Sequence, residues 1–208
     1  KEITTNHATS FCEDFCGTFK LSCEWIKQSQ RHKSIAIDLD EEPLSYGKEN
    51  YLSELTLEQK KRLSLHQKDV LSPCPEKVDI IGALNFSYFI FKERQQLKKY
   101  FLRCRKNLNE KGILILDCFG GSQCQIANEE ETEYEDLGYS YYWDQDHFDP
   151  ITNFAQFYIH FKRKGEKKRK HVFSYDWRMW SIPEIQDLLL ESGFKNSHVY
   201  WEGTDKNG

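Results

Sequence analysis

The pattern of hydrophobic and polar positions divides the chain into two parts, and the first part alternates strands with helices. Apolar runs at Ser34–Ile37, Val78–Leu84 and Gly112–Asp117 are typical of strands that are buried on both faces. Between the last two, Glu93–Asn107 places its apolar residues three or four positions apart, which predicts an amphipathic helix. This alternation predicts an α/β fold with a mostly parallel sheet and helices on both faces.

The first strand–helix–strand unit spans Phe11–Asp40. A short run that can end a strand, Phe11–Glu13, precedes a tight turn at Gly17 and an apolar-periodic stretch at Phe19–Lys27. The next strand stops at Asp38. This is the layout of a nucleotide-binding βαβ unit, in which the first turn supports the ligand and an acid after the second strand binds a ribose.

The second part of the chain has a period of two. Apolar and polar residues alternate in Tyr139–Trp143, Phe154–Arg163 and Lys170–Trp177, with turn-like sequences between them. This pattern predicts three antiparallel strands, so we interpret Gly138–Trp180 as an antiparallel insertion after the fifth strand of a single domain, residues 1–208. The acidic stretch Gln123–Asp136 before it is expected to be a loop.

Capping signals mark two further helices. Asp40 can cap a helix that runs to about Leu52. Ser181 and Glu184 form a capping box for the last helix, and Gly193 suits the residue after its end. A final strand is expected at residues 198–201.

Composition narrows the class of protein. The 208 residues carry a formal net charge of −4, which gives no general attraction to nucleic acid or anionic membranes. No apolar run approaches the roughly 20 residues of a membrane span, and no signal peptide is expected. The seven cysteines lack the spacing of a zinc site, so free thiols in a cytoplasmic protein and no metal are predicted.

The glycine pattern of the first turn separates two cofactor classes. A dinucleotide fingerprint needs three glycines, but Phe15 and Phe19 flank the single Gly17. The stretch instead resembles motif I of class I S-adenosylmethionine (SAM)-dependent methyltransferases, with Glu13 in its acidic position. The motifs EDFCGT, DLD, NFSY, YDWR and YWEGTD, in this order, resemble a subfamily with an altered motif I. The resemblance implies a Rossmann-like methyltransferase fold, SAM as cofactor and methyl transfer as the activity.

The same resemblance implies a set of cofactor residues at the strand ends. Glu13 would lie near the methionine amine, Asp38 would bind both ribose hydroxyls, and Asp69 would meet the adenine amino group. Asn85 and Phe86 would lie beside the sulfonium and its methyl group. The implied cofactor-binding residues are Glu13, Cys16, Gly17, Thr18, Asp38, Leu39, Asp69, Val70, Asn85 and Phe86. Glu13 and Asp38 could alternatively cap a turn or be solvated strand-end acids.

The acceptor side is less constrained by the sequence. Because SAM supplies the reactivity, the protein mainly aligns donor and acceptor and excludes water, and no catalytic triad is needed. Tyr88, Asp144 and His147 are candidate catalytic residues that could border or deprotonate an acceptor. The candidate substrate-binding residues are Tyr88, Trp143, Trp177 and Trp201. Each aromatic residue could instead be an ordinary core residue.

Three functions remain open at this point. The first is methyl transfer to oxygen, nitrogen or sulfur of a small molecule. The second is an RNA or protein methyltransferase that docks through the basic segment Lys162–His171, which could equally be a solvated hairpin turn. The third is a non-catalytic SAM-binding subunit. A nicotinamide-dependent reductase is disfavoured because bulky residues at 15 and 19 would crowd a pyrophosphate. A homodimer through the inserted sheet is possible.

Overall fold

The computed structural model describes residues 8–201, and its first layer is a five-stranded parallel sheet, called sheet A here. Its strands lie in the order β3-β2-β1-β4-β5. The strands are β1 (Ser10–Asp14), β2 (Lys33–Asp38), β3 (Leu63–Gln67), β4 (Val78–Ala83) and β5 (Leu108–Leu116). The chain moves outward from β1 to β3 and then returns to β4. Strand order therefore reverses between β1 and β4, where ligands bind in open α/β sheets.

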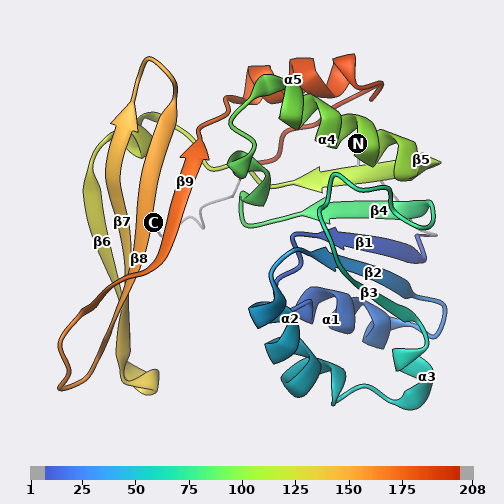
Figure 1. Ribbon diagram of the computed structural model, residues 1–208, viewed down its shortest axis with the longest axis horizontal. Coiled ribbons are helices and arrows are strands. Elements are labelled where there is room, and N and C mark those ends of the chain that lie inside the picture. Colours follow the sequence, from blue (N-terminus) through green and yellow to red (C-terminus); the bar gives the residue numbers. More distant parts are fainter. Residues whose placement is uncertain (1–7, 202–208) are drawn as a thin grey trace.

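Helices cover both faces of sheet A (Figure 1). They are α1 (Lys20–Gln28), α2 (Glu41–Gly47), α3 (Leu57–Lys60), α4 (Arg94–Asn107) and α5 (Ile182–Glu191), with short helical turns at Lys48–Leu52 and Ser87–Ile90. Successive residues of β2 enter two different clusters, as strand geometry requires. Ala36 packs with Phe19 and Leu44 on one side, whereas Ile35 and Ile37 join the larger core that includes α4. The predicted α/β architecture is confirmed.

A second, antiparallel sheet follows, called sheet B here. Its strands lie in sequence order: β6 (Asn128–Tyr134), β7 (Tyr139–Asp149), β8 (Phe154–Arg163) and β9 (Arg169–Arg178). The three predicted strands are present, but the prediction of a loop at Gln123–Asp136 was wrong. Short 3-10 turns at Ser122–Gln125 and Glu135–Leu137 flank β6, the fourth strand. All side chains of β6 are exposed, so this strand has no alternation to reveal it.

Sheet B stands across the carboxyl ends of the sheet A strands (Figure 1). One of its faces, called the inner face here, carries Trp143, Phe157 and Trp177. These side chains belong to the same hydrophobic core as Phe86 and Phe119 from the carboxyl edge of sheet A. The two sheets therefore share one core, and the antiparallel addition after the fifth strand is confirmed.

The C-terminal part of the chain, from residue 181 onwards, confirms one prediction of the sequence analysis and corrects another. Ser181 and Glu184 form the predicted capping box of α5, and Gly193 follows the helix with a φ of 89°. The predicted strand at 198–201 is absent. These residues are exposed, and the described backbone of 195–201 makes no hydrogen bond to β5. The alternating apolar side chains at 198–201 are therefore not buried against a sheet. Residues 202–205 of the YWEGTD motif lie outside the described residues.

Two expectations from composition can be compared with residues 8–201. Within this range no helix is both long enough and apolar enough to cross a membrane. All seven cysteines are free thiols, and six of them are buried. This agrees with the prediction of free thiols.

Candidate cofactor site

The loops that follow β1, β2, β3 and β4 meet at one edge of sheet A, and they carry the predicted cofactor residues. The backbone N–H of Gly17 donates to Asp38 Oδ2 over 2.7 Å, and that of Cys16 donates to Ile37 O over 3.0 Å. The N–H of Lys68, after β3, donates to Asp38 O over 2.8 Å. Asp38 is therefore the point at which three of these loops are tied together.

The turn between β1 and α1 has the backbone of a glycine-rich loop without its outer glycines. Phe15, Gly17 and Phe19 all have positive φ, at 55°, 51° and 46°. A left-handed conformation costs a residue with a side chain roughly 1–2 kcal/mol. Burial offsets this cost, because Phe19 is fully buried. Phe19 also explains Gly47 of α2, where a Cβ would lie 2.4 Å from the Phe19 ring.

The Asp38 carboxylate is oriented by the two loops beside it. Its Oδ2 accepts from Gly17 N–H, and its Oδ1 accepts from Asp40 N–H over 2.9 Å. Asp40 in turn caps α2, as predicted, by accepting from Glu42 N–H. Each Asp38 oxygen keeps a further lone pair, and the side chain is partly exposed. It can therefore accept hydrogen bonds from two hydroxyl groups of a ligand.

Glu13 and Asp14 are neighbours in sequence but point to opposite faces of sheet A. Glu13 Oε2 accepts from the backbone N–H of Ser22 over 2.9 Å and from its hydroxyl over 2.5 Å, which fixes the first turn of α1. Burial raises the pKa of Glu13 to about 7. Its Oε1 accepts no hydrogen bond from residues 8–201, so one oxygen remains available to a ligand.

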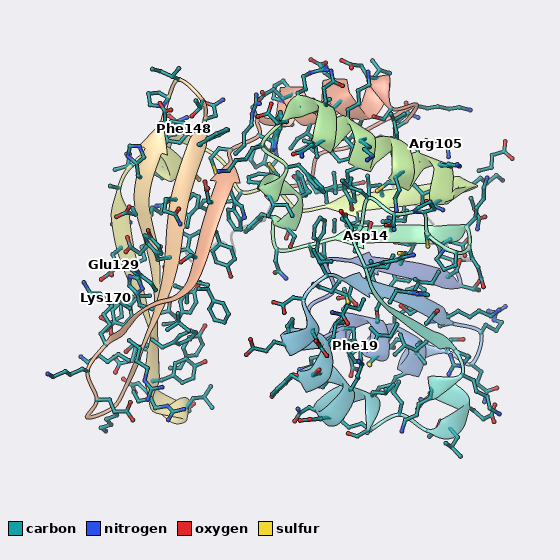
Figure 2. All side chains as sticks on the ribbon, viewed as in Figure 1. Asp14, Phe19, Arg105, Glu129, Phe148 and Lys170 are labelled. Atoms are coloured by element: carbon teal, nitrogen blue, oxygen red, sulfur yellow. The ribbon has the colours of Figure 1, made fainter. Side chains whose placement is uncertain are left out.

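Asp14 is a buried acid that the sequence did not single out (Figure 2). Its Oδ2 accepts from Arg103 Nη1 over 2.5 Å and from the Tyr100 hydroxyl over 2.9 Å. Burial raises the pKa of Asp14, and the Arg103 charge acts in the opposite direction. This pair attaches the end of β1 to α4. The only sequence signal for Asp14 was that it follows another acid in a strand. Because adjacent strand residues face opposite sides of a sheet, one of the two acids has to face away from Ser22 and α1.

The remaining predicted cofactor residues also lie at this edge. Asp69, after β3, is exposed, and its Oδ1 accepts from Leu71 N–H over 2.7 Å. Val70 is buried, whereas Leu39 is 68% exposed beside Asp38. Cys16 is buried, and burial is the largest cause that raises its thiol pKa. Cys16 is therefore not a reactive thiolate, and with Thr18 it could contribute backbone groups.

The loop after β4 is held by Asp117, which the sequence analysis placed at the end of a strand without giving it a role. Asn85 and Phe86 both have positive φ, at 57° and 55°. The Asp117 carboxylate, just after β5, accepts from Asn85 N–H over 2.7 Å and from Phe86 N–H over 2.9 Å. The Asn85 side chain is exposed, and the Phe86 ring contacts Trp177 with a centroid distance of 6.2 Å.

Of the predicted acceptor-side residues, only two adjoin this edge from sheet B. Trp177 contacts Phe86, and Trp143 contacts Phe119 with a centroid distance of 5.8 Å. Tyr88 is instead a core residue with 0% exposure, and its hydroxyl donates to Asp117 O over 2.9 Å. This matches the alternative interpretation of Tyr88 as a packed aromatic residue.

Asp144 and His147 do not lie with the cofactor residues. Asp144 neighbours Trp143 in β7 and therefore faces the opposite, outer side of sheet B. There it bonds His160 Nε2 over 2.9 Å. His147 is exposed and pairs with Gln156 on the same outer face. Neither side chain therefore lies on the inner face of sheet B, which meets the edge of sheet A.

The outer face also carries the one described group of acids and histidine that is compact enough to consider as a metal site: Glu129, Asp144 and His160. His160 Nδ1 accepts the His171 backbone N–H over 2.9 Å, so that nitrogen carries no proton. The proton of the neutral ring is then on Nε2, which donates to Asp144. A metal would need that Nε2 lone pair, so these residues form a hydrogen-bond network and do not fit a metal ion.

The basic segment 162–171 is partly neutralised within sheet B. Lys168 Nζ pairs with Glu129 over 2.5 Å and lies 3.6 Å from the centre of the Tyr142 ring. Arg169 pairs with Glu166 over 3.1 Å. These contacts match the interpretation of a solvated hairpin turn.

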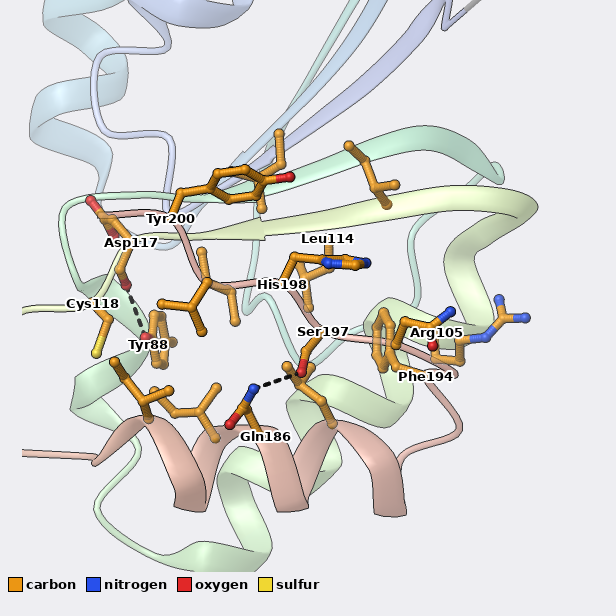
Figure 3. Close-up of a pocket in the computed structure, with 18 of the residues that line it drawn as sticks. Tyr88, Arg105, Leu114, Asp117, Cys118, Gln186, Phe194, Ser197, His198 and Tyr200 are labelled. Atoms are coloured by element: carbon orange, nitrogen blue, oxygen red, sulfur yellow. Dashed lines mark hydrogen bonds between the residues drawn. The ribbon is translucent and has the colours of Figure 1, made fainter. Parts of the chain in front are cut away.

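A large cavity lies elsewhere, beside β5 (Figure 3). It has a volume of about 1520 Å³ and lies between β5, α5 and residues 194–201. It reaches the carboxyl edge at Phe86, Tyr88 and residues 117–120. Trp201, which is 81% exposed, lines this cavity, so it is not part of the inner face of sheet B.

Comparison with known proteins places the fold. A scan against protein-family models finds no match, and no curated protein matches the chain. Solved structures do match. A SAM-dependent methyltransferase from Clostridium acetobutylicum is 23% identical, with a TM-score of 0.70 over 88% of this chain and 72% of that one. The CcbJ methyltransferase from Streptomyces caelestis is 12% identical, with a TM-score of 0.75 over 90% and 73%.

The chain has the class I methyltransferase fold. SAM-bound CalS10 from Micromonospora echinaspora, an amino pentose methyltransferase, has the same fold, with 11% identity and a TM-score of 0.69 over 91% of this chain and 76% of that one. The parallel sheet of this chain and three of the four strands of its antiparallel sheet were expected from the sequence.

Proposed function

We propose that the protein is a SAM-dependent methyltransferase that transfers a methyl group to oxygen, nitrogen or sulfur of a small molecule. The observation that carries this proposal is the turn at residues 15–19, which has the backbone of a glycine-rich loop and is bonded to Asp38. This arrangement supports a ribose acceptor at Asp38, beside a turn that follows β1 next to the point where strand order reverses.

The glycine pattern of this turn favours SAM over a dinucleotide. The dinucleotide fingerprint needs three glycines, and Phe15 and Phe19 flank the single Gly17. Both rings pack into the protein, since Phe19 is fully buried and Phe15 contacts Phe91 and Tyr100. SAM carries no pyrophosphate and does not need that fingerprint.

We assign the proposed roles by position along the edge. Asp38 binds the ribose hydroxyls, Asp69 with Val70 contacts the adenine, and Glu13 Oε1 faces the methionine amine. Asn85 and Phe86 lie beside the sulfonium. When bound, SAM supplies the electrophilic methyl group, and the chain orients it and keeps water away.

The proposed acceptor is a small molecule. KedS8, a sugar N-methyltransferase, and MtfA, a glycopeptide N-methyltransferase, share this fold. In this chain, Trp143 and Trp177 add an apolar wall next to Phe86, which suits an acceptor that displaces water. The partly neutralised hairpin at 162–171 adjoins no comparable aromatic wall and gives less support to an RNA substrate.

Calorimetry with SAM, its demethylated product and NADH tests the proposal. We expect the first two to bind and NADH not to bind. Asp38→Ala should weaken SAM binding by about 1–3 kcal/mol, the scale of a lost charged hydrogen-bond pair. Asp40→Ala is the matched control, because Asp40 caps α2 and should leave SAM binding unchanged. Unchanged SAM affinity in Asp38→Ala would remove Asp38 from the site, and preferential NADH binding would overturn the proposal.

Transfer itself requires a panel of amino, hydroxyl and thiol acceptors with methyl-labelled SAM. Label in an acceptor supports the enzyme. Micromolar SAM binding without label in any acceptor would favour the non-catalytic SAM-binding subunit.

A further inference from the structure

Asp117 makes an arrangement that packing alone does not require. Its two carboxylate oxygens accept from two consecutive backbone N–H groups, those of Asn85 and Phe86, over 2.7 and 2.9 Å. These two residues have left-handed φ values, a conformation rare for any residue but glycine. A pair of successive N–H groups that point at one anion is an anion-binding nest, and here the protein's own carboxylate fills it.

The Asp117 carboxylate is itself fixed. It follows β5 directly, and the buried Tyr88 donates its hydroxyl to the Asp117 carbonyl over 2.9 Å. Hydrogen bonds to an ionised acceptor are about twice as strong as neutral ones, so two of them can offset the strain of the Asn85–Phe86 backbone. The loop after β4 is therefore held in one conformation from the end of β5.

This conformation decides which groups the loop can present. Because both N–H groups are bonded to Asp117, neither is free to bind a ligand. Asn85 instead exposes its side chain, which accepts or donates no hydrogen bond within residues 8–201. Phe86 directs its ring against Trp177 and Phe119, so the same loop also meets the inner face of sheet B.

We propose that Asp117 is the positioning residue for the methyl-donor end of the site. It acts through the loop: it holds the Asn85 side chain and the Phe86 ring beside the sulfonium and the acceptor. This inference rests on the proposed function. It assigns a role in alignment to an acid that directly follows β5 and lies outside the ribose and adenine contacts.

Binding of three ligands to Asp117→Ala and Asp117→Asn tests the proposal. Adenosine occupies only the Asp38 and Asp69 end, whereas SAM and its demethylated product also reach Asn85. We expect Asp117→Ala to bind adenosine within twofold of the original protein and to bind SAM about 10-fold or more weakly. Asp117→Asn keeps one acceptor oxygen, so its affinity for SAM should lie between those of the original protein and Asp117→Ala. Asp38→Ala should weaken all three ligands.

The outcomes separate the possible failures. Equal weakening of adenosine and SAM in both Asp117 variants would show a merely structural role and overturn the proposal, as would unchanged SAM binding. Near-ultraviolet circular dichroism adds a second readout, because Trp177 contacts the loop through Phe86, and its signal should change in both variants. If the original protein binds adenosine and SAM with no preference for either, the proposed function fails before Asp117 is tested.

Discussion

At the scale of single residues, Glu13 combines a structural bond with an unusual ionisation. Its carboxyl group is half-buried beside Ser22, and this partial burial raises its pKa from 4.5 to about 7. An acid whose pKa is higher in the folded state binds more protons when folded than when unfolded. Its ionisation therefore destabilises the fold as pH rises.

The pH window follows from these two values. Below pH 4.5 both states are protonated, and above about pH 7 both are ionised. Between them, the free energy of unfolding should fall with rising pH, by on the order of 2–3 kcal/mol from this group. Urea denaturation at pH 5 and pH 7.5 measures the change. In Glu13→Gln that contribution should vanish, while the amide oxygen still accepts from Ser22.

Other acids also titrate in this range. The contribution of Glu13 is therefore the difference between the pH dependence of the original protein and that of Glu13→Gln. If the original protein and Glu13→Gln show the same pH dependence, the Glu13 carboxyl group titrates normally. SAM would lower this pKa if its amine lies at Glu13 Oε1, so the difference should shrink when SAM is added.

Residue roles were predictable where position along a strand determines them. Asp38 was predicted at the end of a buried strand, and the structure places it between two loop N–H groups. The roles of Asp14 and Asp117 could not be found in this way, although Asp117 was placed at the end of a predicted strand. Their partners, Arg103 and the Asn85–Phe86 backbone, are distant in sequence, and nothing local distinguishes these acids from solvated ones.

At the scale of elements, the buried Asp14–Arg103 pair joins β1 to α4. Arg103 also donates from Nε to the carbonyl of Ser72 in the loop after β3, and its Nη2 has no partner in residues 8–201. The pair therefore connects the end of β1, which lies at the proposed site, to α4 and to the loop after β3.

Arg103→Met should lower the free energy of unfolding by about 3–5 kcal/mol, because it leaves a buried carboxylate without its partner. Lys106→Met, at an exposed position on the same helix, should change it by no more than about 0.5 kcal/mol. Chemical denaturation measures both. Combining Arg103→Met with Asp14→Asn should recover part of the loss, and equal stability of the two single Met variants would contradict the assignment.

Elements were predictable where burial imposes a period or where a cap marks an end. The helix expected at Glu93–Asn107 is α4 (Arg94–Asn107), and the capping box of α5 is present. At the surface, the alternation of apolar and polar residues missed one strand and predicted another that is absent. β6 is a strand without alternation, and residues 198–201 alternate without forming a strand.

At the scale of the whole molecule, the two sheets are held together mainly by aromatic residues at the edge where the proposed site lies. Trp180 donates its ring N–H to Phe91 O over 3.1 Å, and Trp177, with 3% exposure, packs on Phe86 and Phe89. The surface that would enclose the acceptor therefore also attaches sheet B.

Trp177→Ala should show how much the contact between sheets A and B contributes to stability, as distinct from the packing within sheet A. Removing a buried ring of this size costs about 3–5 kcal/mol, and here the loss falls on the contact between the sheets. We expect lower stability in urea and faster proteolysis between β5 and β6, where residues 117–121 have no regular secondary structure. Adenosine should still bind, because Asp38 and Asp69 lie at the edge of sheet A and not in sheet B. Trp201→Ala removes a tryptophan with 81% exposure and should leave stability within about 0.5 kcal/mol. Equal effects of the two substitutions would show that Trp177 does not attach sheet B.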